Sequence, residues 1–389
     1  MNHVVVVGAG LAGVRSVEAL RARGYHGRVT LVGDEGHRPY DRPPLSKAVL
    51  AGGLDSTVVD SDLGALDIDL RTNVAAKGLR PGVVETTEGE LEFDGLVIAT
   101  GAAPIRLRGD GPQHTLRTID DALDLRARLL PGARVVVVGA GWIGAEVATA
   151  ARRAGCEVTV VEAAASPLAV ALGTEVGGHT AAWYAEAGIA LRLGVMVGSV
   201  DPGGLTLVDG TWIPADLVVT GVGVRPAVGW LAGSGVALDN GVLVDEHLRT
   251  SLDGVVAAGD CANWWSRRFG RRLRVEHWDT ALHSPETAVA TLLGQTAVYD
   301  PVPYFWSEQF GHMLQYAGHH AGARLVMRGD PASAPKWAAL WLTKDDRLSA
   351  IFTVDLPRDL VQGRRIVEGG QRLDVNRAKD PSIPLRDCL

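Results

Sequence analysis

The chain has 389 residues, more than one ordinary domain holds, so two or three domains are expected. Hydrophobic residues make up 47% of it and charged residues 21%, which is typical of a globular protein. The net charge of −7 argues against general nucleic-acid binding. No apolar run reaches the roughly 18 residues of a membrane span, and the N-terminus lacks the basic start of a signal peptide. We therefore expect a cytoplasmic protein that binds no membrane.

The first predicted element is a β-branched strand, Val4–Val7, which runs into a glycine-rich turn, Gly8–Gly13. Apolar residues then recur at helical spacing as far as Gly24, a residue typical of a helix C-cap. A second strand covers residues 28–32, and the acidic residue Asp34 comes just after it. Strand, glycine turn, helix, strand and acid in this order are the fingerprint of a dinucleotide-binding unit.

A stiff basic segment, YDRPPLSK (Tyr40–Lys47), comes next. Its two prolines fix φ near about −65° and supply no backbone N–H donors. Arg42 and Lys47 are its cations, and it contains no cysteine. The alternative is a proline-rich surface loop with solvated charges.

The opening layout returns 131 residues later, counted from Gly8 to Gly139. A strand at 134–138 leads into the turn Gly139–Gly144, an Ala-rich helix follows, and a strand from residue 157 ends at Glu162. Each copy continues with a hairpin and then an apolar strand that runs into glycine. These pairs lie at 83–93 and 94–101 in the first copy, and at 205–213 and 215–223 in the second. The chain therefore contains an internal duplication, with a period too long for a solenoid.

The glycines of each turn have distinct physical roles. The first permits the turn, the second lets backbone N–H groups reach a pyrophosphate, and the third lets the helix pack close to the strand. These roles fall on Gly8, Gly10 and Gly13 in the first copy and on Gly139, Gly141 and Gly144 in the second. One such motif is weak evidence, but two with correct flanking strands predict two dinucleotide sites.

The acidic residues indicate which dinucleotide each copy binds. Glu162 ends its strand, where a carboxylate accepts bonds from ribose hydroxyls and repels a 2′-phosphate, and residues 163–172 contain no arginine. The second copy is therefore predicted to bind NAD(H), which leaves FAD for the first, with Asp34 at its ribose. Because Gly33 occupies the strand end itself, a solvated Asp34 is the alternative. A later strand running into Gly259 and Asp260 is a second flavin signal, unless Asp260 is a plain turn residue.

With the further motifs LVIATGAAP, LRTIDDA, GVGVRP, AAGDCAN, VEHW and FWSEQF, the chain resembles the pyridine-nucleotide-dependent flavoprotein oxidoreductases. More closely, it resembles the ferredoxin reductases of oxygenase systems, over essentially its whole length. The resemblance implies an α/β fold with two Rossmann-like dinucleotide-binding domains and a C-terminal α+β domain. We expect an FAD-binding domain at 1–108 and 227–303, an NAD-binding domain at 109–226 and the C-terminal domain at 304–389.

The implied function is NADH-dependent ferredoxin reduction. A hydride would pass from NADH to FAD, and single electrons would then pass to an iron–sulfur ferredoxin that feeds an oxygenase such as a cytochrome P450 or a Rieske dioxygenase. Disulfide reductases of the same superfamily carry a cysteine pair where this chain has YDRPPLSK, so electrons are expected to leave the flavin directly. The alternatives are a rubredoxin reductase, an NADH oxidase, or a redox-sensing flavoprotein like apoptosis-inducing factor. A monomer and a homodimer are both compatible with the sequence.

The resemblance also implies roles for individual residues. Lys47 is expected near flavin N5, Glu146 near the nicotinamide and Trp278 beside both rings, although Glu146 is also explained by a structural role. The residues expected to bind FAD are Gly8, Gly10, Leu11, Ala12, Gly13, Asp34, Arg42, Lys47, Val74, Ala99, Thr100, Gly101, Arg117, Gly259, Asp260 and Trp278. The residues expected to bind NAD are Gly139, Gly141, Ile143, Gly144, Glu162, Val222 and Gly223.

Some residues around Trp278 depart from the family pattern. His277 precedes it, and His283 and Ser284 follow where a glutamine–glycine helix start is usual. Pro285 suits the first position of a helix, so a helix is predicted to begin there. In the C-terminal domain Trp306 is expected either to cover the flavin region or to be an ordinary core residue.

Five arginines lie close together between Asp260 and Trp278. We call them the arginine cluster: Arg267, Arg268, Arg271, Arg272 and Arg274. Because ferredoxins are generally acidic, a basic rim near the flavin would speed and orient their docking. The alternative is a solvated arginine-rich hairpin.

The three cysteines, Cys156, Cys261 and Cys388, are widely spaced. None forms a C-x-x-C pair, so neither a metal site nor a local redox disulfide is predicted. We expect all three to be structural.

Overall fold

The computed structural model describes residues 1–389 and divides them into two compact units. Unit 1 comprises 1–41, 57–103 and 225–303, and unit 2 comprises 42–56, 104–224 and 304–389. The α/β class is as predicted, with two Rossmann-like folds and a C-terminal domain. The limits of the three predicted domains stay a prediction, because the two compact units do not correspond to them one to one.

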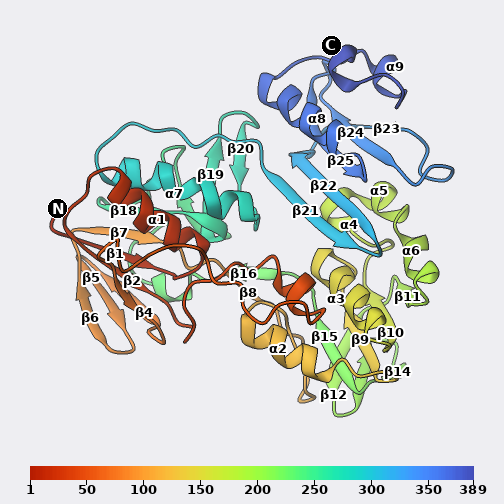
Figure 1. Ribbon diagram of the computed structural model, residues 1–389, viewed down its shortest axis with the longest axis horizontal. Helices are drawn as coiled ribbons and strands as arrows, with labels where there is room; N and C mark the ends of the chain where they lie inside the picture. Colours follow the sequence, from red (N-terminus) through yellow and green to blue (C-terminus); the bar gives the residue numbers. More distant parts are fainter. The chain divides into compact units, whose positions relative to one another are not determined.

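Unit 1 is built on a five-stranded parallel sheet in the order β18–β7–β1–β2–β3. Its strands are β1 (His3–Val7), β2 (Arg28–Val32), β3 (Asp69–Arg71), β7 (Gly95–Ile98) and β18 (Val255–Ala257). Parallel strands covered on both faces consist of near-continuous apolar runs, which explains the buried valines of β1. The long helices α1 (Leu11–Ala22) and α7 (Trp278–Leu292) lie against each other beside this sheet (Figure 1).

Two small sheets complete unit 1. The antiparallel sheet of the first predicted hairpin is β4 (Ala76–Arg80), β5 (Val83–Thr86) and β6 (Gly89–Glu92). The other small sheet is β17 (Val242–Val244), β19 (Ala262–Ser266) and β20 (Arg271–Leu273), with the short helices η2 (Gly229–Leu231) and η3 (Gly259–Cys261) nearby in the chain. A two-stranded pair, β8 (Ala102–Pro104) and β16 (Val224–Pro226), lies where the chain passes from one unit to the other.

The first part of unit 2 repeats this plan with a four-stranded parallel sheet in the order β11–β10–β9–β15. Its strands are β9 (Arg134–Val138), β10 (Glu157–Glu162), β11 (Ala190–Leu193) and β15 (Leu217–Thr220), and its antiparallel strands are β12 (Val197–Asp201), β13 (Gly204–Leu207) and β14 (Trp212–Pro214). The helices are η1 (Leu45–Val49), α2 (Ile119–Arg128), α3 (Trp142–Arg153), α4 (Ala169–Leu172), α5 (Thr174–Gly178) and α6 (Ala181–Glu186). The α2 helix starts with a capping box, in which Thr118 and Asp121 bond each other's backbone N–H groups.

The C-terminal part of unit 2 is an antiparallel sheet in the order β21–β22–β25–β24–β23. Its elements are β21 (Tyr304–Gln309), β22 (His312–Gly318), β23 (Arg324–Arg328), β24 (Trp337–Leu342), β25 (Leu348–Val354), α8 (Pro357–Gly369), α9 (Val375–Ala378) and η4 (Leu385–Cys388). The α8 helix lies along this sheet (Figure 1). The sheet shares an apolar core with α4–α6, where Leu172 and Trp183 pack with Trp337 and Phe352.

The prediction that a helix begins at Pro285 is wrong. The α7 helix begins at Trp278 and contains Pro285 in its interior. Asp279 in the first turn favours a helix start at Trp278, because a carboxylate there interacts well with the helix dipole. Trp278 also binds Asp41 through its indole, at 3.0 Å between Nε1 and Oδ1, which fixes the helix start. No helix of the structure is both long and apolar enough to cross a bilayer.

A buried arginine holds the end of the C-terminal domain in place. Arg328 is 1% exposed, and its guanidinium donates to Asp359 Oδ2 at 2.7 Å. It also donates to the carbonyls of Ala378 at 3.0 Å, Asp380 at 2.6 Å and Ile383 at 2.8 Å. One side chain therefore satisfies a carboxylate and three backbone acceptors that α9 and the C-terminal turn leave open.

We predict that Arg328→Ala destabilises unit 2 by about 3–5 kcal/mol, because removal of one partner leaves a partly buried carboxylate unpaired. Urea unfolding, followed by tryptophan fluorescence, measures this loss. The control is Arg324→Ala on the same strand, whose ion pair with Asp346 is half exposed, so a loss below about 1 kcal/mol is expected. Equal losses in the two variants would contradict the anchoring role.

Candidate functional site

The first glycine turn has no room for side chains at two of its three glycines. A Cβ on Gly8, whose φ is +112°, would lie 2.2 Å from the carbonyl oxygen of Ala99. A Cβ on Gly13 would lie 1.9 Å from the carbonyl oxygen of Gly8. Gly10 differs, since a Cβ there would meet nothing within 4 Å. The first and third glycines therefore serve the fold, and the second faces open space where a ligand can approach the backbone.

The α1 helix begins directly at this open glycine. Its N-cap is Gly10, and no side chain caps the helix. The first N–H groups of a helix lack partners within it and carry the positive end of its dipole, which suits a pyrophosphate. A helix N-terminus without a side-chain cap, next to a glycine with free space beside it, fits the dinucleotide expected there. Leu11, Ala12 and Gly13 form the first turn of this helix.

The second glycine turn has the same construction within unit 2. A Cβ on Gly139, whose φ is +101°, would lie 2.4 Å from Gly221 O, and one on Gly144 would lie 2.0 Å from Gly139 O. Gly141 is again open, and it caps α3 without a side-chain bond. Ile143 and Val222 are exposed apolar residues beside this turn, and Gly223 has a φ of +103°. These residues fit a second dinucleotide.

The acids at the two strand ends differ in position. Gly8 N–H bonds Val32 O at 2.8 Å and Gly139 N–H bonds Val161 O at 2.8 Å, so Gly33 in the first copy matches Glu162 in the second. A side chain on Gly33 would lie 2.6 Å from the Cβ of Ala9. No acid therefore fits the strand end of the first copy, and Asp34 follows it as an exposed residue.

Glu162 is held beside the second glycine turn. Its carboxylate accepts the N–H of Ala140 at 2.7 Å through one oxygen and the N–H of Ala164 at 2.7 Å through the other. A carboxylate has about four acceptor positions, so two remain for ribose hydroxyls. The nearby Tyr184 hydroxyl is buried, and burial raises its pKa, so it adds no charge here.

Other predicted FAD-binding residues of unit 1 lie at strand ends around the first turn. Ala99, Thr100 and Gly101 follow β7, and the Thr100 hydroxyl donates to Ala227 O at 2.8 Å. Val74 is buried, and its N–H is bonded to Gly33 O at 2.8 Å, which leaves its carbonyl for an adenine.

Gly259 and Asp260 form the helical turn after β18. The N–H of Gly259 donates to Ser284 Oγ at 2.9 Å, so the unexpected serine of α7 supports this turn. Sequence reasoning assigned Ser284 no role, although it noted the residue as a departure from the family.

The two histidines near Trp278 have different surroundings. The imidazole of His277 is partly buried, and its desolvation lowers its pKa to about 4, so it is neutral at physiological pH. His283 is exposed, with Nε2 3.7 Å from Asp279 Oδ1. The neutral His277 is therefore not a proton donor near neutral pH.

The YDRPPLSK segment crosses from unit 1 to unit 2 after Asp41. Arg42 donates to the carbonyl of Arg117 at 2.6 Å, which brings these two predicted FAD-binding arginines together in unit 2. Lys47 lies 2.9 Å from the carboxylate of Glu146, which is 3% exposed. Two of the three predicted catalytic residues therefore form one buried ion pair.

Sequence reasoning missed two other partners of Glu146. The hydroxyls of Ser46 and Ser307 both donate to its carboxylate. Each serine stands inside a motif that the sequence analysis quoted, but no spacing rule links residues 46, 146 and 307. Only the fold brings them together.

The arginine cluster is part of a hairpin formed by β19 and β20. Arg267 pairs with Glu246, Arg274 pairs with Glu276 at 2.6 Å, and Arg272 donates to the carbonyls of Val244 at 2.8 Å and Asn263 at 3.0 Å. Three of the five arginines are thus used within unit 1. The exposed Arg268 and Arg271 lie in the turn and at the start of β20.

All three cysteines are buried and free of disulfide bonds, in agreement with the structural role predicted for them. Burial raises the pKa of Cys261 to about 11 and also raises the pKa values of Cys156 and Cys388. Buried thiols of this kind are poor nucleophiles, because the thiolate is the reactive form.

Comparison with known proteins agrees with this architecture. The family model described as pyridine nucleotide-disulphide oxidoreductase matches residues 2–284, and the model described as reductase C-terminal matches residues 304–389. The chain therefore belongs to the pyridine nucleotide-disulphide oxidoreductase family, within its ferredoxin–NAD(+) reductase branch.

Among its relatives is the ferredoxin–NAD(+) reductase component of the anthranilate 1,2-dioxygenase system of Burkholderia cepacia. It is 37% identical over 403 residues, which cover 99% of this chain and 98% of the relative. The crystal structure of Fdr9 is similar with a TM-score of 0.95 and 51% identity, covering 99% of each chain. The reductase in the covalent putidaredoxin reductase–putidaredoxin complex has a TM-score of 0.94 and 33% identity, covering 99% of this chain and 97% of that one.

The steric difference between the glycines gives a direct prediction. Gly141→Ala adds a methyl group in open space, so the midpoint of thermal unfolding should change by less than about 2 °C while the KM for NADH rises at least about 10-fold. Gly144→Ala drives a methyl group into a backbone carbonyl, so it should lower the unfolding midpoint markedly. Differential scanning fluorimetry and NADH–ferricyanide kinetics measure the two effects. A destabilised Gly141→Ala variant, or one that binds NADH normally, would contradict this assignment.

Proposed function

We propose that the protein is an FAD-dependent ferredoxin–NAD(+) reductase that oxidises NADH and reduces an iron–sulfur ferredoxin. The observation that carries this proposal is the pair of matching glycine turns. In each turn a side chain would clash with backbone atoms at the first and third glycine, whereas the second glycine has free space beside it. One turn in each unit gives one site for FAD and one for NADH. The similarity to a ferredoxin–NAD(+) reductase component of a dioxygenase system supports the same activity.

The NADH site is assigned to unit 2. Backbone N–H groups from Gly141 onward would bind the pyrophosphate, and Ile143 and Val222 would contact the dinucleotide mainly through their backbone. Glu162, already fixed by two backbone N–H groups, accepts the ribose hydroxyls and repels a 2′-phosphate. NADH is therefore preferred to NADPH.

The FAD site is assigned to the turn Gly8–Gly13, with Asp34, Val74, Asp260 and the predicted residues around them. FAD, when bound, accepts two electrons as a hydride and releases them one at a time. Lys47, paired with Glu146, would supply a positive charge near flavin N5, and Trp278 would contact the rings. Arg42 and Arg117 would supply further positive charge to the pyrophosphate.

The protein needs no thiol for this reaction. Family members that reduce disulfides use a cysteine pair, but the YDRPPLSK segment has none, and the three cysteines of the chain are buried without disulfides. Electrons then leave for a separate redox protein, which feeds an oxygenase such as a cytochrome P450 or a Rieske dioxygenase. This partner distinguishes the proposal from an NADH oxidase, which passes electrons to oxygen.

Steady-state kinetics test the function. With FAD bound, NADH should support cytochrome c reduction that depends on added ferredoxin, and NADPH should give at least about 10-fold lower kcat/KM, because Glu162 repels its 2′-phosphate. Several bacterial ferredoxins of oxygenase systems, assayed in parallel, serve as acceptors. NADH oxidation that ferredoxin does not accelerate, with hydrogen peroxide as the product, would indicate an oxidase instead.

We further propose that Arg268 and Arg271, which are both exposed on the β19–β20 hairpin, contribute to ferredoxin docking. The double variant Arg268→Glu/Arg271→Glu should raise the KM for an acidic ferredoxin about 5- to 10-fold at low salt and weaken its salt dependence. NADH–ferricyanide activity should stay unchanged.

The matched control for this docking test is Lys77→Glu/Arg108→Glu, which reverses two exposed charges that are not part of the β19–β20 hairpin. It should leave the KM for ferredoxin within about 2-fold of the wild type. If both double variants raise it equally, net charge alone acts and the docking assignment is wrong.

A further inference from the structure

The buried carboxylate of Glu146 lies where three segments of unit 2 meet. Glu146 is on α3, one turn beyond the open Gly141. Ser46 and Lys47 come from η1, and Ser307 comes from β21 of the C-terminal domain. Ser46 is 5% exposed and Ser307 0%, so water does not compete for these contacts.

Every group around this carboxylate is a donor. One oxygen accepts the hydroxyl of Ser307 at 2.5 Å and the N–H of Glu308 at 3.3 Å. The other accepts the hydroxyl of Ser46, and the ammonium of Lys47 lies 2.9 Å from both oxygens. These four donors match the roughly four acceptor positions of an ionised carboxylate. The site is therefore complete only with a negative charge on Glu146.

The direction of the Ser307 bond is fixed by its neighbour. The amide of Gln309 donates to Ser307 Oγ at 3.0 Å from a position 1% exposed on the same face of β21. A hydroxyl that accepts from Gln309 directs its own proton to Glu146. The C-terminal domain thus presents one oriented donor to a carboxylate of the NAD-binding helix.

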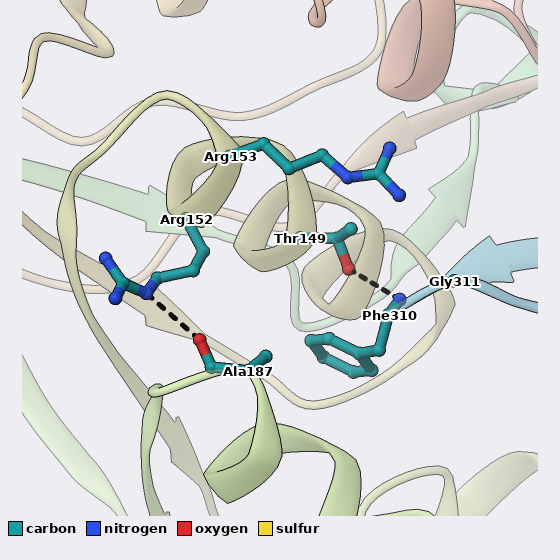
Figure 2. Close-up of a pocket in the computed structure, with 6 residues that line it drawn as sticks. All are labelled: Thr149, Arg152, Arg153, Ala187, Phe310 and Gly311. Carbon is teal, nitrogen blue, oxygen red and sulfur yellow. Dashed lines mark hydrogen bonds between the residues drawn. The ribbon is translucent and has the colours of Figure 1, made fainter.

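A second contact joins the same strand end to the same helix, one turn further on. The N–H of Phe310 donates to Thr149 Oγ1 at 3.1 Å, above a pocket of about 450 Å³ that Arg152, Arg153, Ala187 and Gly311 also line (Figure 2). This bond attaches β21 to α3 without touching Glu146 or Lys47. A variant that removes this bond therefore weakens the attachment of β21 to α3 and leaves the donors to the Glu146 carboxylate in place.

We propose that Ser307 is a positioning residue for the reduction reaction: through Glu146 it fixes the ammonium of Lys47. The inference rests on the proposed function, in which the Lys47–Glu146 ion pair acts near the flavin. Without the hydroxyl, that carboxylate oxygen loses its shortest bond and keeps the Glu308 N–H at 3.3 Å and the Lys47 ammonium at 2.9 Å, so no neutral donor from the C-terminal domain holds it closely. A shift of the carboxylate would move Lys47 as well, because the two form a direct ion pair. The C-terminal domain is in this way part of the machinery that orients the reacting groups.

The test compares Ser307→Ala with Thr149→Val, which removes the second α3–β21 hydroxyl contact. Stopped-flow reduction of the FAD-loaded protein at saturating NADH should be about 10-fold slower in Ser307→Ala and within 2-fold of the wild type in Thr149→Val. NAD+ affinity, measured by calorimetry, should change less than 2-fold in both variants. A residue with only a structural role is not expected to lower the rate of flavin reduction while it leaves the affinity for NAD+ unchanged.

A double-mutant cycle with Glu146→Gln completes the test. Glu146→Gln alone should slow reduction, and adding Ser307→Ala to it should slow reduction no further, because the hydroxyl has lost its charged partner. Equal losses in Ser307→Ala and Thr149→Val, additive effects in the cycle, or a wild-type rate in Ser307→Ala would each overturn the role of Ser307 while leaving the proposed function intact. A wild-type rate in Glu146→Gln would overturn the role of the ion pair itself, and the inference with it.

Discussion

The need to satisfy one buried carboxylate organises the reactive part of unit 2. Glu146 lies inside the protein on α3, and an unpaired charge there would cost several kcal/mol. Its donors come from the proline-rich segment before the second Rossmann-like fold and from the C-terminal domain after it. A single carboxylate therefore joins pieces of chain that lie about 100 and 161 residues away. These bonds are among the contacts that place residues 42–56 in unit 2, although they precede most of the first Rossmann-like fold in sequence.

The glycine turns depend on a different constraint, the close approach of two backbones. At Gly13 and Gly144 the helix comes so near the preceding turn that a Cβ would lie within about 2 Å of a carbonyl oxygen. This geometry needs only local sequence, so the motif, its flanking strands and its duplication were all predictable. The strands 28–32 and 134–138 have the predicted limits in the structure. The second glycines, Gly10 and Gly141, differ from the others in that a Cβ there would meet nothing within 4 Å.

Contacts between distant segments were not predictable, because no periodicity encodes them. The Trp278–Asp41 bond and the serine donors to Glu146 depend on tertiary placement. The start of α7 was misplaced because the sequence rule for Pro285 is local, whereas the helix begins where Trp278 is anchored. The arginine cluster had the hairpin form that was considered for it, but its charge is reduced by Glu246, which lies 21 positions away from Arg267.

A lysine–carboxylate pair in place of a thiol pair is the central chemical feature of this protein. Anaerobic titration of the FAD-loaded chain with dithionite tests it most directly. Because no cysteine forms a disulfide, full reduction should take two electrons per chain, all accounted for by the loss of flavin absorbance. Uptake of four electrons, with two thiols appearing on reduction, would contradict this account.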